Sequence, residues 1–168
     1  MKIIIFALLL LAILVSISNY KDLIVKRNKV KSSWVMTDMQ LKTRFDFIPS
    51  LLEALKGHTE IETSKLEAVI KARNQYISAC DSADMIKANN EMTSALSQLF
   101  ALIDSYPELK EDVNYIELQK KLTEIDENII NSGQSYNDAV LIYNNAIHDF
   151  PANLIAAVFG FGEEPYFR

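Results

Sequence analysis

The stretch YIELQKKLTEIDENIINSGQSYNDAVLIYNNAIHDF, residues 115–150, decides the fold because its apolar and aromatic residues recur at alternating intervals of three and four. The residues of this seam are Tyr115, Leu118, Leu122, Ile125, Ile129, Ser132, Tyr136, Ala139, Tyr143, Ala146 and Phe150. Such spacing puts them on one face of a single long helix, as in helices that pack along one another in a coiled coil. Gly133 lies inside this helix at a cost of about 1 kcal/mol in helix propensity relative to alanine, which predicts a local bend or close packing there.

Three more amphipathic stretches precede this helix. The first runs from the N-terminal apolar segment to Gly57, which is its natural stop, and the others cover about 59–80 and 83–105. With 4 Gly and 4 Pro in 168 residues, the chain has too few turn formers for a β-sandwich or a β-barrel. The sequence therefore predicts an all-α fold, an antiparallel up-and-down helical bundle with two long and two short helices.

Prolines and a cysteine refine this prediction. Pro49 lies within the first long helix and predicts a kink, whereas Tyr106-Pro107 and Phe150-Pro151 end the helices before them. Cys80 falls on the apolar stripe of the second stretch, so we expect a buried small hydrophobe rather than a reactive thiol.

The N-terminal segment has the composition of a membrane anchor. Residues 3–17 are apolar except for Ser16, and extension to Tyr20 gives about 18 residues or ~27 Å of helix, enough to span a bilayer. Lys2 and the small residues after the run also fit a secretory signal peptide, an alternative that stays open. The helical pattern that continues beyond Tyr20 favours an uncleaved transmembrane helix.

Flanking charge indicates the orientation of this anchor. Five basic residues follow the apolar run and only one precedes it, and basic flanks tend to stay cytoplasmic. The residues that follow are Lys21, Lys26, Arg27, Lys29 and Lys31. The count places the helical bundle in the cytoplasm with the N-terminus outside, and an exported bundle is the alternative.

Three parts are expected: a transmembrane anchor at 1–20, a four-helix bundle at 21–150 and an apolar C-terminal tail at 151–168. The two long helices outrun the short pair, which predicts a two-helix stem near the membrane that cannot bury its own aromatic residues. A second copy, the tail or another protein must cover that stem. The uncharged run from Phe150 to Gly162 is too short to span a bilayer, so it either lies at the membrane surface or folds over the stem.

Several function classes are disfavoured. The net charge of −5 and the pI near 5.1 argue against nucleic-acid binding. No His-Glu-x-x-His pattern, nucleophile elbow or phosphate-binding loop occurs, and the two histidines, His58 and His148, are expected at the surface. We therefore predict no catalytic activity, no metal and no cofactor.

An ordered series of motifs resembles the LemA family of small bacterial membrane proteins. The motifs are Arg27-Asn28-Lys29-Val30, Ser33-Trp34, Asp38-Met39-Gln40-Leu41, Arg44-Phe45-Asp46-Phe47-Ile48-Pro49, Tyr106-Pro107-Glu108-Leu109-Lys110, Tyr136-Asn137-Asp138-Ala139-Val140, Tyr143-Asn144 and Phe150-Pro151. Gly133 departs from the family pattern, which commonly places an arginine there. The resemblance implies an anchored up-and-down bundle in the bacterial envelope, with no known reaction. Some relatives help to build internal membrane compartments, which implies a membrane-organising role.

We single out nine residues as interaction candidates: Arg27, Trp34, Asp38, Tyr136, Asn137, Tyr143, Asn144, Phe159 and Phe161. The charged residues Arg27 and Asp38 lie on the seam, where a charge must be paired or hydrated. We expect either an internal pair, with an arginine or a tyrosine hydroxyl, or a contact with a partner molecule. The repeated Tyr-Asn pairs at 136–137 and 143–144 either fix the register of the bundle or contact another molecule.

Two hypotheses of function follow. The first is a membrane-anchored scaffold that self-associates as a homo-oligomer, touches membrane lipid and recruits other envelope proteins. The second is a sensor or adaptor that binds a ligand in the bundle or regulates an envelope protease or assembly. A large cavity with convergent polar groups favours the sensor, and an uncovered apolar stem favours the scaffold.

Overall fold

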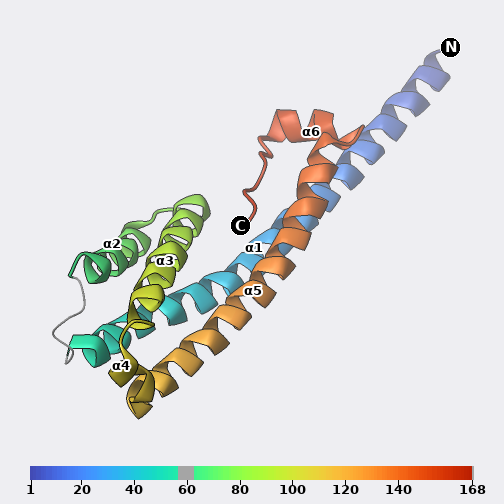
Figure 1. Ribbon diagram of the computed structural model, residues 1–168. Helices are drawn as coiled ribbons and strands as arrows, with labels where there is room; N and C mark the ends of the chain where they lie inside the picture. The colour runs from blue at the N-terminus through green and yellow to red at the C-terminus, as the bar shows by residue number, and fades with distance from the viewer. Residues whose placement is uncertain (57–62, 168) are drawn as a thin grey trace. The chain divides into compact units, whose positions relative to one another are not determined.

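The structure, a computed structural model, describes residues 1–56 and 63–167. Over these ranges the chain forms helices and no strand (Figure 1). The helices are α1 (Lys2–Lys56), α2 (Thr63–Ser78), α3 (Ser82–Ile103), α4 (Pro107–Glu111), α5 (Val113–His148) and α6 (Ala152–Phe159). The all-α prediction is confirmed, with α1 and α5 as the long helices and α2 and α3 as the short ones. Gly57 and His58 lie outside the described residues, so the predicted stop at Gly57 stays a prediction.

The prediction that Cys80 is buried was wrong. The helix α2 ends at Ser78, two residues before the cysteine, and Cys80 is exposed in the turn that follows. This turn is fixed by Asp81, whose side chain caps α3 by accepting a hydrogen bond from the backbone N–H of Asp84 at 2.9 Å. The start of α3 at its cap, rather than the apolar stripe of α2, therefore determines where the turn that contains Cys80 lies.

The long fourth helix also ends earlier than expected. The helix α5 stops at His148, and Phe150, predicted as the last residue of its seam, is 80% exposed. At its start the Asp112 carboxylate caps the helix by accepting from the N–H of Tyr115 at 3.1 Å. The five-residue helix α4 precedes Asp112, with Pro107 at its first position, where a missing N–H is tolerated.

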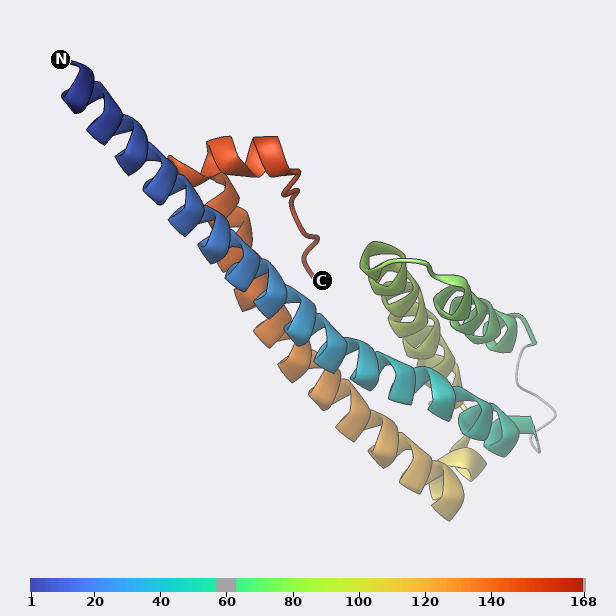
Figure 2. The same cartoon turned by 180° about the vertical axis from the view of Figure 1, so that it is seen from behind.

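The chain divides into two compact units, each of which takes part of α1 and part of α5. We call residues 36–133 together with Phe167 the hairpin unit. Its core is apolar and comprises Leu41, Phe45, Ile48, Leu51, Leu55, Val69, Met92, Leu99, Ile103, Leu122, Ile125 and Ile129. In this unit α2 and α3 lie side by side (Figures 1 and 2), and Pro49 lies inside α1, which continues to Lys56.

Gly133 shows the close packing that the sequence predicted. A Cβ atom at this position would lie 2.5 Å from Cδ1 of the Phe167 ring, so the aromatic side chain occupies the space that any larger residue would need. The glycine therefore makes room for a residue 34 positions later in the chain.

We call residues 1–35 and 134–166 the anchor unit. By length and composition α1 could cross a membrane: its most apolar 18-residue window has a mean hydropathy of 2.5, and none of that window is buried. Figure 2 shows the chain leaving the end of α5, passing through α6 and turning back. The buried side chains of this unit include Leu23, Val30, Tyr136, Ala139, Val140, Tyr143, Ile147, Ile155, Ala156 and Phe161. The expected boundaries at residues 20 and 150 stay a prediction.

Candidate interaction site

The anchor unit holds its C-terminal tail, residues 160–166, by the main chain. The hydroxyl of Tyr136 donates to the carbonyl oxygen of Pro165 at 2.8 Å, and the hydroxyl of Tyr143 donates to that of Gly162 at 3.0 Å. Both tyrosines are buried, and their spacing of seven puts them on one face of α5, two turns apart. The heptad spacing thus places two hydroxyl donors where the tail runs along α5.

Asn144 completes this clasp. Its Nδ2 donates to the carbonyl oxygen of Glu164 at 2.9 Å, and its Oδ1 accepts from the backbone N–H of Glu164 at 3.0 Å. Because all four contacts are with backbone atoms, they hold an extended chain without reading its side chains. The tail therefore covers Tyr136 and Tyr143, two aromatic residues of the predicted stem, whereas Leu141 on the same helix stays 49% exposed.

An aromatic cluster lies where the tail meets α1. The Tyr20 ring is 4.8 Å from the Phe159 ring and 5.8 Å from the Phe161 ring, measured between centroids. The guanidinium carbon of Arg27 lies 5.7 Å from the centroid of the Phe161 ring, within reach of a cation–π interaction. Phe161 is buried and Phe159 is 60% exposed, so one phenylalanine joins the tail to α1 and the other faces outward.

Two charged residues act on the Tyr143 hydroxyl of the clasp, Arg27 and Glu164. Burial raises the pKa of the Tyr143 hydroxyl, while Arg27 lowers it and Glu164 raises it further. Nε2 of His148 and Oε1 of Glu163 are 2.6 Å apart on the exposed edge of the clasp, where an ion pair contributes little to stability. The hydroxyl of Tyr143 thus stays a donor throughout the neutral pH range.

Asp38 lies in the other unit and makes an internal pair. The hydroxyl of Tyr76 donates to Oδ1 of Asp38 at 2.6 Å, and the Tyr76 ring stacks on that of Phe45 with 4.0 Å between centroids. Burial raises the pKa of Tyr76 well above its ordinary value, and the hydrogen bond to Asp38 adds to the rise. Of the partners predicted for Asp38, the structure shows the internal pair with a tyrosine hydroxyl.

The remaining candidates pack within the anchor unit. Trp34 is half-buried and meets Tyr136 edge-on, with 5.2 Å between ring centroids. Asn137 is half-buried on α5, seven residues before Asn144. Seven of the nine candidates therefore gather around the tail: Arg27, Trp34, Tyr136, Tyr143, Asn144, Phe159 and Phe161.

Sequence reasoning missed several contributors. Tyr20 is an aromatic residue at the end of the apolar run, which is a common place for an interfacial anchor, so a signal for it was present. The tail residues Gly162, Glu164 and Pro165 contribute backbone atoms, which no side-chain pattern reveals.

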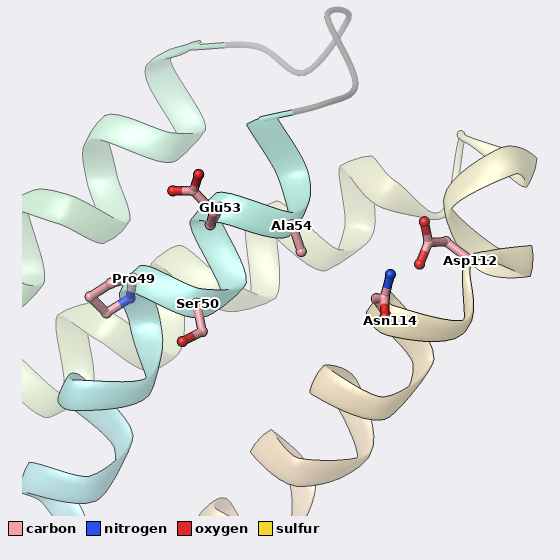
Figure 3. A pocket seen from close by; sticks show the side chains of 6 residues that line it. All are labelled: Pro49, Ser50, Glu53, Ala54, Asp112 and Asn114. Atoms are coloured by element: carbon pink, nitrogen blue, oxygen red, sulfur yellow. The ribbon is translucent and has the colours of Figure 1, made fainter.

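A separate hollow of ≈ 580 Å³ lies in the hairpin unit between α1 and the start of α5 (Figure 3). It is lined by Pro49, Ser50, Glu53, Ala54, Asp112 and Asn114. In Figure 3 the carboxylate of Glu53 points away from Asp112 and Asn114, and the carboxylate of Asp112 is already engaged in capping α5. These side chains do not converge on a common point. Across residues 1–56 and 63–167, no group of three His, Cys, Asp or Glu residues could hold a metal ion.

Comparison with known proteins gives magnetosome proteins as relatives. Magnetosome proteins MamQ 1 and MamQ 2 of Paramagnetospirillum magneticum are each 29% identical to the chain over 84 residues, and magnetosome protein MamQ of Magnetospirillum gryphiswaldense is 25% identical over the same length. Each match covers 50% of this chain and 31% of the relative.

The family comparison reaches further. The sequence profile of the LemA family matches residues 33–168, which leaves the Arg27-Asn28-Lys29-Val30 motif before its start. The match includes the whole clasp on α5 and the tail that it holds. Together with the apolar part of α1, it describes a membrane-associated helical protein. The chain belongs to the LemA family.

Proposed function

We propose that this protein is a single-pass, membrane-anchored helical scaffold of the bacterial envelope, without catalytic activity, whose helix α6 lies in the membrane surface. The observation that carries this proposal is the contact between Tyr20 and Phe159. Tyr20 stands at the end of the apolar run of α1, where a transmembrane helix leaves the hydrocarbon core. Its contact with Phe159 brings α6 to that level.

The composition of α6 suits an interfacial helix. Its sequence ANLIAAVF carries no charge, and its exposed residues include Leu154, Val158 and Phe159, of which Val158 is 78% exposed. Phe150, just before the helix, is exposed as well. Apolar side chains at the height of the headgroups can bury themselves in the acyl boundary, which gives this face a lipid partner.

Orientation and self-association are further parts of the proposal. The basic residues after the apolar run favour a cytoplasmic bundle, with an exported bundle as the alternative. Leu141 and Ile142 remain exposed on α5 in the anchor unit, and anchors confined to one plane raise the effective concentration of identical chains. We therefore expect a homo-oligomer that could also recruit other envelope proteins. Light scattering of the detergent-solubilised protein measures this, and a monomer would refute it.

A depth-dependent quenching experiment tests the membrane contact. In a Trp34→Phe background, a tryptophan placed at Phe159 in the full chain is the single tryptophan and is excited selectively, and the protein is reconstituted into liposomes that contain bromolipids. We expect strong quenching at position 159. The matched control places the tryptophan at Asn145, an exposed polar position on α5, where quenching should be weak. Equal quenching at the two positions would contradict the proposal.

A second function is favoured by one specific observation. The hairpin unit contains a cavity with convergent polar groups around the buried Arg44, which fits a sensor or adaptor that binds a ligand or regulates an envelope protease or assembly.

A further inference from the structure

The hairpin unit contains a second cavity, of ≈ 360 Å³, among α1, α3, α5 and the side chain of Phe167. Cavities that bind small molecules typically measure about 300–1,000 Å³, so this one is at the small end of that range. Its polar wall comes from three different helices and its apolar wall includes Ile129 and Phe167. A mixed lining of this kind differs from that of an ordinary packing defect, which is apolar.

Arg44 organises the polar wall. It is 4% exposed, and its Nη1 donates to Oδ1 of Asn89 and to Oγ1 of Thr93, both at 2.9 Å. The hydroxyl of Thr93 itself donates to the backbone carbonyl of Asn89 at 3.0 Å, so its oxygen is free to accept from the arginine. The orientation of the guanidinium is thereby fixed from the side of α3.

Asp126 on α5 adds a carboxylate to the polar wall. Its Oδ1 lies 3.1 Å from Nε of Arg44, close enough for an ion pair, yet neither atom makes a hydrogen bond within the described part of the chain. Burial lowers the pKa of Arg44 and raises that of Asp126, and in each case the attraction of the partner opposes the shift. Both atoms are shielded from solvent, so a ligand in the cavity would meet the remaining polar atoms of the two groups, among them the carboxylate of Asp126, whose side chain is 40% exposed.

The charges of the wall select the class of ligand. Arg44 can only donate and an ionised Asp126 can only accept, and together they carry no net charge. An anion would compete with Asp126 for the arginine, and a cation would compete with Arg44 for the carboxylate. A neutral group with an acceptor beside a donor, such as a primary amide, satisfies both without separating them. A flat apolar body attached to it would face Ile129 and Phe167.

We propose that this cavity binds an uncharged small ligand that carries a primary amide next to a flat apolar group. This inference goes beyond the membrane scaffold and gives the second candidate function its ligand class. It does not involve α6 or the clasp, so its failure and the failure of the proposed membrane contact are distinguishable.

Three probes of one shape test the proposal: benzamide, benzoate and benzamidine. The full chain in lipid nanodiscs is titrated with each probe while the isoleucine methyl NMR signals of Ile129 and Ile130 are followed. We expect saturable shifts with benzamide at an affinity at least about threefold higher than with either charged probe. Replacement of Asp126 by Asn leaves the wall with a net positive charge, so benzoate should gain about tenfold relative to benzamide.

A cavity-filling variant provides the structural control. Asn90 is exposed on α3 and lines the cavity, so Asn90→Trp should weaken benzamide binding at least about tenfold. Ser97→Trp, seven residues further on the same helix face and outside the lining, should leave binding unchanged. Equal binding of the three probes, no saturation with benzamide, or full binding by Asn90→Trp would overturn the proposal. If Asn90→Trp fails to fold by circular dichroism, the Asp126→Asn variant decides, and no gain for benzoate overturns it.

Discussion

Asn144 grips the backbone of Glu164 from both sides, since its side-chain amide donates to the carbonyl oxygen at 2.9 Å and accepts from the N–H at 3.0 Å. The two residues are 20 positions apart, and α6 lies between them. The side-chain amide thus pairs with both the N–H and the C=O of one residue, as a residue on a neighbouring antiparallel β-strand would. This contact fixes the backbone of the tail at Glu164 against α5.

Replacement of Asn144 by Ala should release the tail. Two hydrogen bonds are lost and the peptide group of Glu164 is left without them, at a cost of about 1–3 kcal/mol. Amide hydrogen exchange over residues 160–166 should accelerate about tenfold or more while exchange in α3 stays as it was. Asn145→Ala, at the exposed neighbouring position, is the control and should have no effect. Unchanged exchange in Asn144→Ala would contradict the role of the clasp.

Tyr143→Phe separates the hydrogen bond from the ring. The ring is fully buried and would remain so, but the donor to the carbonyl of Gly162 is lost, which should cost about 1 kcal/mol. We expect faster cleavage of the tail by a protease, about fivefold, with circular dichroism unchanged. A loss of helix content instead would mean that Tyr143 stabilises the anchor unit as a whole.

The heptad seam of α5 predicted the long helix and the shared face of Tyr136 and Tyr143, because spacing alone determines which residues share a helix face. The clasp could not be predicted in the same way. Its acceptors are carbonyl groups of Gly162 and Pro165, and every residue carries such a group, so nothing in the side-chain pattern marks them. The sequence allowed the tail either to fold over the stem or to lie at the membrane surface. It gave no sign of the hydrogen bonds that hold the tail.

Cys80 illustrates a different limit. The apolar stripe of α2 points to a buried cysteine, but a stripe gives a periodicity and not an end point. The end is set by Asp81, whose carboxylate bonds the N–H of Asp84. That capping signal is visible in the sequence and competes with the stripe. Where the two disagree, the cap prevails because unsatisfied N–H groups at a helix start cost more than exposure of one small thiol.

Gly133 and Phe167 should be energetically coupled. In the wild type, Gly133→Ala gains helix propensity but forces the ring of Phe167 to move, since the new Cβ would lie 2.5 Å from it. In a Phe167→Ala background the same change should stabilise the protein by about 1 kcal/mol because the clash with the Phe167 ring is gone. Chemical denaturation of the four proteins of this cycle measures the coupling, and additive effects would contradict it.

The pair of Arg44 and Asp126 should give an unusual pH dependence. Burial raises the pKa of Asp126 above its ordinary value of 3.8, so the folded state binds a proton more readily than the unfolded state. The stability that this group contributes is full below pH 3.8 and is lost as the pH rises through the raised pKa. Asp126→Asn removes this loss and should be at least as stable as the wild type at pH 7, with the difference vanishing in acid.

Melting temperatures of the two proteins between pH 3 and pH 8 measure this difference. Asp149→Asn, a carboxylate on an exposed position outside the hairpin unit, controls for the change in net charge. If Asp126→Asn melts lower than the wild type at pH 7 and the gap closes in acid, attraction to Arg44 outweighs burial and the sign of the prediction is wrong.

The orientation of the anchor can be read from the native cysteine. Cys80 is exposed, and it is the single cysteine of the chain, so a membrane-impermeant maleimide reports the side on which the hairpin unit lies without any added residue. The basic residues that follow the apolar run favour the cytoplasm. We therefore expect Cys80 in whole cells to stay unlabelled until the cells are lysed, when labelling should become complete. Cys80→Ser sets the background, and a cysteine introduced at Lys2, on the other side of the anchor, should show the opposite pattern. Efficient labelling of Cys80 before lysis, with position 2 protected, would place the hairpin unit outside and make the exported arrangement correct.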